Sequence, residues 1–477
     1  MTKNEAVSGI SGYAAKLTEL SDAIWDHPEV KYHESFACSL LSEFMHSEGF
    51  TVVTGCAGIP TAFTATFGAG RPHIGLLGEY DALDGMSQVA EVDTRCPVVK
   101  GAPGHGCGHN LLGVGSVGAA LLVRDYLKAG HSGTVTFFGC PAEEGGSGKT
   151  FMAREGIFDD LDTAVTWHPG DTNSVANGSN LANIQVAYHF KGKAAHAAIS
   201  PDLGRSALDA IELMNMGIQF LREHVPDGCR IHYAITNTGG NSPNVVQAEA
   251  DGIYLMRAKA LPVVRSIKER IDDIARGAAL MTGTKVEIEF IKACSNVMPN
   301  KVLVGVMQKN LEEYGSADYD DADRALAKKM RDSMEDRDDY YFELVSEISD
   351  PELRERLLSD RESPIYNAIL PCPDKEECGM ASSDVGDVSW ICPTVQCSTV
   401  TMPGGTVMHS WQEVAVGKST MAHKGMLQAS KIMAGTVIDA LEDPSIIEAS
   451  KAELTRRTGG APYVCPIPKD VPVPLNL

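Results

Sequence analysis

The chain has 477 residues, a formal net charge of −22 and an ordinary globular composition, 43% hydrophobic and 22% charged. This length exceeds one ordinary core, and it predicts two domains or one domain with an insertion. The acidic excess disfavours nucleic acid and anionic membranes as partners, and twelve scattered cysteines without an export leader or a long apolar run favour a cytoplasmic protein with reduced thiols.

The first 182 residues alternate between two apolar patterns. Helical spacing predicts helices over residues 4–25, 35–49 and 111–130. Short apolar runs that end in polar or glycine-rich turns predict strands at residues 61–68, 73–81, 133–140 and 163–168. This alternation favours an α/β domain in which helices cover a mostly parallel sheet.

The pattern changes near residue 182. Strands and helices are expected in the order β-α-β-β-α-β, at residues 182–192, 204–225, 230–236, 252–259, 262–283 and 285–292. This order predicts a ferredoxin-like α+β domain inserted at 183–296, with 1–182 and 297–477 forming the first domain. The charge-dense helical stretch 316–363 is expected to be a solvated excursion.

The stretch GHGCGHNLLG places Cys107 and His109 two positions apart in a glycine-rich turn that leads into a helix. Both side chains can therefore converge on one point. A thiolate is a competent metal ligand, and a helix N-terminus or a nearby cation favours that form. The alternative is a buried thiol beside a histidine that caps the helix.

Three further segments place polar side chains after predicted strands. Glu143 and Glu144 are adjacent carboxylates, which repel each other unless a cation or a shared proton relieves them. His168 ends another strand, and His409 follows a glycine-rich loop. Each of these residues, taken alone, could instead have a purely structural role. Together with the cysteine turn they suit a pair of divalent transition metals at the edge of an α/β sheet.

Such a centre predicts a reaction class. Two cations close together would polarise a carbonyl and lower the pKa of a water molecule between them. Glu143 could take the proton of that water and pass it to a leaving amine. Asp81 follows a further strand, where it could orient a ligand histidine or simply form a turn. The residues thus favour metal-assisted amide hydrolysis.

Long blocks of the sequence carry a family resemblance. The blocks include LGEYDAL, GHGCGHNLLG, CPAEEGGSGKT, TWHPGD, FKGKAAHAAISPDLGRSALDA and SDVGDVSW. They resemble the dinuclear metallopeptidase family that contains aminoacylases, auxin-conjugate amidohydrolases and glutamate carboxypeptidases, and the likeness covers nearly the whole chain. The resemblance implies that Glu143 is the general base. It implies these metal ligands: Cys107, His109, Glu144, His168 and His409.

The resemblance also assigns roles to the inserted domain, which it implies to be a dimerisation or lid domain. His196 matches a histidine that helps to hold the scissile carbonyl, often across a dimer. Asn244 and Arg257 match positions that bind a substrate carboxylate. From the residues alone, His196 could be a surface histidine and Arg257 part of a structural ion pair. A guanidinium nevertheless has the geometry that suits a carboxylate.

One departure concerns the metals. Much of the family has a ligand histidine in an H-x-D motif, where this chain has Glu79, Tyr80 and Asp81. We therefore expect two divalent ions with manganese favoured, although a thiolate ligand would favour zinc.

The resemblance implies an N-acyl or N-aroyl amino acid as the small-molecule substrate. The substrate we expect is p-aminobenzoyl-glutamate, and the alternatives are a dipeptide or an indole-acetyl conjugate. The implied assembly is a homodimer or a heterodimer with a related subunit. In the heterodimer, this chain could be active only with its unlike partner.

Overall fold

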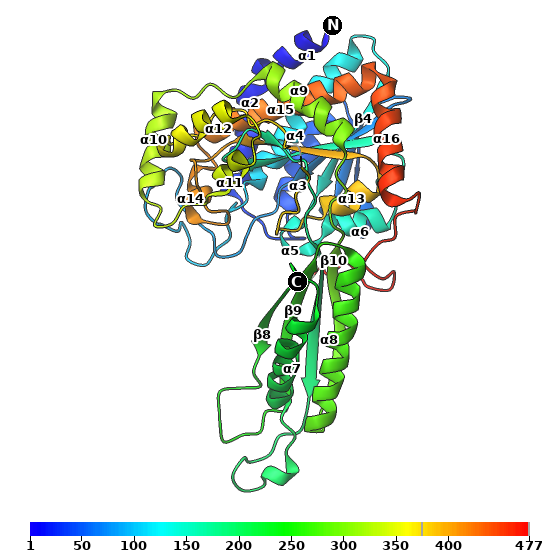
Figure 1. The fold of residues 1–477 in the computed structure, drawn as a ribbon, viewed down its shortest axis with the longest axis vertical. Helices are drawn as coiled ribbons and strands as arrows, with labels where there is room; N and C mark the ends of the chain where they lie inside the picture. The colour runs from blue at the N-terminus through cyan, green and yellow to red at the C-terminus, as the bar shows by residue number, and fades with distance from the viewer. Residues whose placement is uncertain (374, 476–477) are drawn as a thin grey trace.

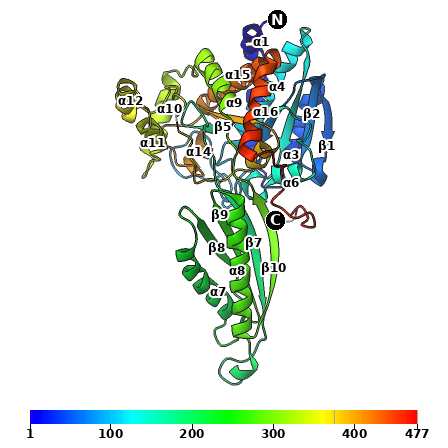
Figure 2. The same ribbon diagram turned by 45° about the vertical axis from the view of Figure 1, so that its right-hand side comes forward.

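The molecule has two parts, each built on its own β-sheet (Figure 1). The structure is a computed structural model that describes residues 1–373 and 375–475. The upper part in the view carries both the N-terminal helices and the last helices of the chain, and the lower part is a long arm (Figures 1 and 2). The chain therefore leaves the upper part once and returns to it.

The upper sheet has seven strands. They are β1 (Thr51–Thr54), β2 (Phe63–Ala69), β3 (His73–Glu79), β4 (Gly133–Cys140), β5 (Thr163–Gly170), β6 (Ser174–Val175) and β11 (Thr394–Val400), and their order is β1-β2-β4-β3-β5-β11-β6. The four central strands, β4, β3, β5 and β11, run parallel, and antiparallel pairs lie at both edges. The mostly parallel sheet of the α/β prediction is confirmed.

Helices cover both faces of this sheet. On one face lie α2 (Ile10–Asp26), α3 (Ser35–Ser47), α4 (His109–Lys128), α9 (Lys301–Tyr314) and α15 (Thr420–Glu442), which share a core with Leu76 of β3. On the other face lie α6 (Gly148–Arg154) and α13 (Val385–Ile391), which pack with Leu77. All eight residues of β4 are buried. Burial on both faces explains why the central strands read as continuous apolar runs.

The arm is a four-stranded antiparallel sheet with two helices on one face. Its elements are β7 (Ala182–Lys191), α7 (Ala207–Leu221), β8 (Arg230–Asn237), β9 (Glu249–Ala258), α8 (Leu261–Thr282) and β10 (Lys285–Cys294). The strand order is β10-β7-β9-β8. Ala182 pairs with Ala258 at the end near the upper sheet, and Lys191 pairs with Glu249 at the far end. Ten residues of β7 thus separate the two ends by about 30 Å.

The charge-dense segment is more buried than its sequence predicts. It forms α10 (Asp321–Asp332), α11 (Tyr340–Ser346) and α12 (Pro351–Leu358). Tyr341, Phe342 and Val345 pack with Leu357 in a small core of their own. A solvated excursion is therefore wrong for this segment, because the apolar residues between its charges form a separate cluster.

The remaining helices complete the upper part. They are α1 (Lys3–Ser8), α5 (Glu143–Gly146), α14 (Trp411–Val416) and α16 (Pro444–Thr458). The single helix expected over residues 4–25 is two helices, since Gly9 separates α1 from α2. Among the described residues, no helix combines the length and apolar character needed to cross a membrane.

Candidate metal centre

The residues expected to bind metal lie at the edge where the central strands end. Because β3, β4, β5 and β11 are parallel, their carboxyl ends meet there. Cys107 lies in the turn before α4, His109 is the first residue of α4, Glu143 and Glu144 open α5 after β4, His168 lies in β5, and His409 precedes α14.

Two groups of possible ligands share one thiol. Cys107 lies with His109 and His168 in one group and with Glu144 and His409 in the other, and the ligand atoms within each group lie within 4.8 Å of one another. Cys107 Sγ is 3.5 Å from His168 Nε2, and Glu144 Oε1 is 3.2 Å from His409 Nε2. Two three-ligand groups that share one residue could hold a pair of adjacent cations.

Gly108 makes the tight turn between the first two ligands possible. Its φ is +67°, in the left-handed region, and a Cβ at this position would lie 2.9 Å from Pro169 Cβ. A residue with a side chain would therefore be strained and would also collide with the segment that follows His168. Glycine lets the Cys107 turn lie directly against the end of β5.

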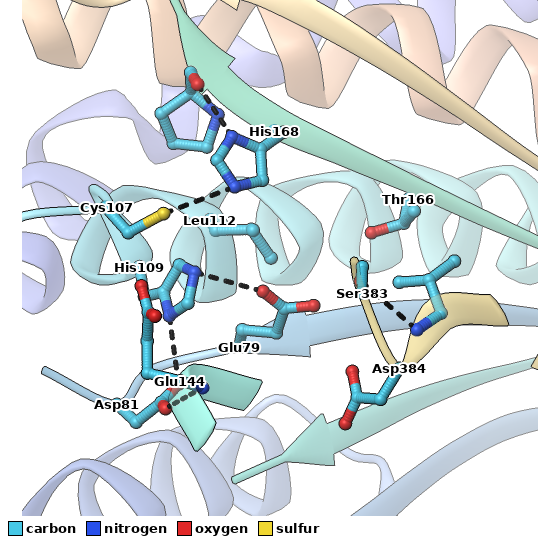
Figure 3. Close-up of polar contacts among 12 residues, drawn as sticks. Glu79, Asp81, Cys107, His109, Leu112, Glu144, Thr166, His168, Ser383 and Asp384 are labelled. Carbon is cyan, nitrogen blue, oxygen red and sulfur yellow. Dashed lines mark hydrogen bonds and ion pairs between the residues drawn. The ribbon is translucent and has the colours of Figure 1, made fainter. Parts of the chain in front are cut away.

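Asp81 supports one ligand from each group (Figure 3). Its Oδ1 lies 2.9 Å from His109 Nδ1, and its Oδ2 accepts a hydrogen bond of 2.8 Å from the Glu144 backbone N–H. The first contact fixes the tautomer of His109, because Nδ1 carries the proton and Nε2 keeps a lone pair for a metal. Of the two sequence readings of Asp81, ligand orientation agrees with these contacts.

The buried polar atoms of the centre fit a bound cation. His109 Nε2 and Glu144 Oε1 are buried and have no hydrogen-bond partner among the described residues. His109 Nε2 faces Glu79 Oε2 at 3.2 Å, so a neutral His109 would point a lone pair at a carboxylate. Burial opposes protonation of His109, but Asp81 and Glu79 raise its pKa well above the usual value. A metal ion would satisfy these atoms in place of that proton.

Glu143 and Glu144 have opposite electrostatic surroundings. Burial raises the pKa of Glu143 well above its usual value, and the charges of Glu79 and Glu144 raise it further. Burial also acts to raise the pKa of Glu144, but the close contact with His409 and the charge of His109 lower it to about 2. Glu144 is thus suited to remain an anionic ligand, whereas Glu143 is suited to hold a proton.

Lys149 neutralises the carboxylates behind the centre, a role that sequence reasoning did not assign. It is fully buried, and its Nζ lies 2.6 Å from Glu79 Oε1 and 2.6 Å from Asp384 Oδ1. Burial alone would lower its pKa, but Asp384 and Glu79 raise it well above the usual value. Glu79, which stands where much of the family has a histidine, is therefore held by a fixed cation.

His409 reaches the centre from a strained backbone. Its φ of 58° is uncommon for a residue other than glycine. Glu413, one helical turn later, accepts a hydrogen bond of 2.9 Å from the His409 N–H. Glu413 is buried and was also missed by sequence reasoning, although its place four residues after a candidate ligand histidine at a helix start was a usable signal.

The three residues expected to contact substrate lie at opposite ends of the arm. Arg257 is on β9 at the end near the metal centre, where its Nη1 donates to Ser382 Oγ at 3.0 Å. His196 and Asn244 lie beyond the far ends of the strands, in neighbouring loops joined by a bridge between His196 and Val245. Within one chain, the structure therefore brings Arg257 towards the centre but leaves His196 and Asn244 far from it.

Comparisons with known proteins agree with this architecture. The family model for peptidase family M20/M25/M40 matches residues 75–471. The chain is 46% identical over 464 residues to a p-aminobenzoyl-glutamate hydrolase subunit of Escherichia coli, covering 97% of this chain and 96% of the relative. It is 28% identical over 467 residues to the Xaa-Arg dipeptidase of Mus musculus, covering 95% and 92%.

A solved structure shows the same fold. The dinuclear metal-binding peptidase of the M20 family from Bacillus subtilis superposes with a TM-score of 0.57 at 16% identity, covering 91% of this chain and 99% of that one. The family match spans most of the chain and includes every proposed metal ligand. The chain belongs to peptidase family M20/M25/M40, and it is a metal-dependent amidohydrolase or peptidase of that family.

Proposed function

We propose that the chain hydrolyses the amide bond between an acyl or aroyl group and an amino acid, with p-aminobenzoyl-glutamate as the favoured substrate. The observation that carries this proposal is the pair of ligand groups that share Cys107, with Glu143 within 4.8 Å of the His109 ligand atom. Among the described residues, the Glu143 carboxylate has no hydrogen bond, so it is free to exchange a proton with water.

The chain's own residues perform the proton transfers. When bound, two divalent cations polarise the substrate carbonyl and lower the pKa of a nearby water molecule. Glu143 accepts a proton from that water as its oxygen adds to the carbonyl carbon. Glu143 then delivers the proton to the amide nitrogen while the C–N bond breaks, which releases a carboxylate and an amine. The raised pKa of Glu143 suits both steps.

The substrate assignment draws on two observations. The Escherichia coli relative, which is 46% identical, is named for p-aminobenzoyl-glutamate. Arg257 offers a guanidinium at the junction between the arm and the metal centre, where the carboxylate of a conjugated amino acid could bind. The mouse relative is named for a dipeptide, so a dipeptide is the second candidate, and an indole-acetyl conjugate is the third.

We propose two manganese ions at the centre, with zinc as the alternative. Oxygen and nitrogen ligands from Glu144, His109, His168 and His409 suit manganese, whereas the Cys107 thiolate suits zinc. Twelve free cysteines fit the proposed cytoplasmic location.

We further propose that a second subunit, either identical or related, completes the site. His196 lies about 30 Å from the centre of its own chain, so a partner's arm would have to supply it. The arm also exposes apolar side chains suited to an interface: Met216 54%, Phe220 67%, Tyr233 45%, Leu280 85% and Met281 70%. The Escherichia coli relative is itself named as a subunit.

The proposal is tested with Glu143→Ala in the purified, metal-loaded protein. We expect this variant to keep its metal and to lose about 10²–10⁴-fold in turnover of p-aminobenzoyl-glutamate, since a general base contributes that much. Glu43→Ala, an exposed glutamate on α3, is the matched control. Metal analysis and release of p-aminobenzoate are the two measurements.

Two results would contradict parts of the proposal. Undiminished turnover by Glu143→Ala would remove its role as the base. A wild-type chain that is loaded with metal but inert on glutamate, dipeptide and indole-acetyl conjugates would show that it acts only with an unlike partner. Co-expression with a related subunit would then restore turnover.

A further inference from the structure

Two lysines are buried in the described part of the chain, and only one has a partner. Lys149 is paired with Glu79 and Asp384. Lys292, on β10, is 7% exposed, yet no hydrogen bond or ion pair joins it to another described residue. Its Nζ is not among the buried polar atoms without a partner in the described residues, so the ammonium group reaches solvent while the aliphatic stem is buried. Lys292 therefore offers an unpaired ammonium group that a bound anion could contact.

Lys292 and Arg257 lie on the same open face of the arm. Lys292 pairs with Gln185, and Arg257 pairs with Asn183, two positions along the central strand β7. The alternate residue Ile184 packs in the core with α7 and α8, so the side chains of Gln185 and Asn183 point the other way. Lys292 and Arg257 share that direction and stand on the two strands that flank β7.

The spacing of the two cations suits one small dianion. Two strand separations and a two-residue offset place their Cα atoms roughly 12 Å apart. Both side chains are long enough to extend about 6 Å towards a common ligand. The two carboxylates of glutamate or aspartate, a few bonds apart, could therefore be bound separately by the two groups.

Both cations lie at the end of the arm that is next to the upper part. Arg257 donates to Ser382, two residues before the Asp384 that holds Lys149. The pKa of Cys294, two residues after Lys292, depends on charges from both the arm and the upper part. Burial raises the pKa of Cys294, the charge of Lys292 opposes the rise, and the charges of Asp384 and Glu143 add to it. The charges of Lys292 and of the proposed base Glu143 thus both shift the pKa of the buried Cys294 thiol.

We propose that Lys292 and Arg257 form a dicarboxylate site in which Arg257 binds the α-carboxylate and Lys292 selects the side-chain carboxylate of an acidic amino acid. This inference rests on the proposed hydrolysis, because it places the amino-acid half of the substrate beside the metal centre. It restricts the substrate class to conjugates of glutamate or aspartate. Arg257 suits a forked contact, and the lysine suits a point charge.

The test compares p-aminobenzoyl-glutamate with p-aminobenzoyl-glutamine, which differ only in the charge of the side chain. We expect wild-type kcat/KM to favour the glutamate conjugate by roughly 10- to 100-fold, the contribution of a charge-assisted hydrogen bond. Lys292→Met should bring this ratio close to one, and Lys292→Arg should restore most of it. Lys285→Met is the matched control, because Lys285 is exposed at the far end of the same strand.

A binding measurement separates this inference from the proposed function. Calorimetry with the metal-loaded Glu143→Ala protein compares free glutamate with free glutamine, so it does not depend on turnover. Weaker glutamate binding by the additional Lys292→Met substitution supports the site even if no conjugate is cleaved. An unchanged glutamate preference in Lys292→Met, by either measurement, overturns it. If Lys292→Met does not fold, Lys292→Gln replaces it under the same criterion.

Discussion

Asp81 links the two halves of the metal centre through one carboxylate. Its two oxygens contact different ligand residues, so the orientation of His109 and the backbone position of Glu144 depend on each other. Residues that orient metal ligands commonly affect affinity almost as much as the ligands do. The position of Asp81 directly after β3 places it at the edge where all the ligands meet.

Replacing Asp81 should weaken both metal sites at once. We expect Asp81→Ala to lower metal affinity by about 10- to 100-fold, because His109 loses its fixed tautomer and the Glu144 N–H loses its acceptor. A competition titration with a coloured chelator measures this loss. Asp84→Ala, an exposed aspartate three residues later, should bind metal as the wild type does. Equal affinities for the two variants would show that Asp81 only forms a turn.

Backbone strain gathers around the same centre. Three residues other than glycine near it have positive φ: Ala142 (59°), Ser147 (59°) and His409 (58°). Such conformations are costly and persist only where the surroundings hold them. Here the surroundings include the Ala142 N–H bond to Glu34 and the His409 N–H bond to Glu413. Buried carboxylates therefore fix the loops as well as the ligands.

At the scale of elements, the contact between the α4 turn and the end of β5 decides whether the ligands meet. We expect Gly108→Ala to reduce metal content and to destabilise the protein by about 1–2 kcal/mol or more, since it combines a left-handed residue with a collision at Pro169. Metal analysis and thermal unfolding measure both effects.

The control for this prediction is another glycine-to-alanine change in a helix. Gly12 in α2 has no positive φ and no atom within 4 Å of the added methyl group. Gly12→Ala should therefore stabilise the protein by roughly 0.5–1 kcal/mol. A Gly108→Ala protein with wild-type metal content would refute the packing argument for this turn.

Elements with strong local patterns were predictable from the sequence, and those fixed by distant pairing were not. The buried runs of β3, β4 and β5 and the alternation in the arm carry clear signals. By contrast, β1 has four residues and β6 has two, too few to show a period. The strand β11 alternates apolar and polar residues and was not expected at all.

The same distinction applies to the site. The turn with Cys107 and His109 is a local motif, so its convergence could be inferred. The pairing of Lys149 with Asp384 joins residues 235 positions apart, and nothing local marks it. Lys292 was missed for a related reason, because a lysine in a strand gives no sign that its partner is absent. Burial and pairing are properties of the folded chain alone.

At the scale of the whole molecule, the length of the arm separates the residues proposed for catalysis. The proposed base lies in α5 of the upper part, and His196 lies in the loop beyond the far end of β7. If the assembly is a homodimer, each site combines one chain's Glu143 with its partner's His196. Two inactive variants should then complement each other.

Mixing Glu143→Ala with His196→Ala tests this arrangement. Each variant alone should be nearly inactive, whereas subunit exchange should recover up to about a quarter of wild-type turnover, because half of the dimers are mixed and each has one intact site. Mixing Glu143→Ala with Glu143→Gln is the control and should recover nothing. Absence of recovery after confirmed exchange would show that the two residues do not act across a dimer.

The length of the arm bears on how the specific activity of the enzyme depends on its concentration. If His196 has the proposed catalytic role, its position about 30 Å from the reacting atoms of its own chain means that it can serve only another molecule. Specific activity should therefore fall on dilution, in step with dissociation of the pair. A catalytically dead chain with an intact arm would act as an activator of a dilute enzyme rather than as an inhibitor.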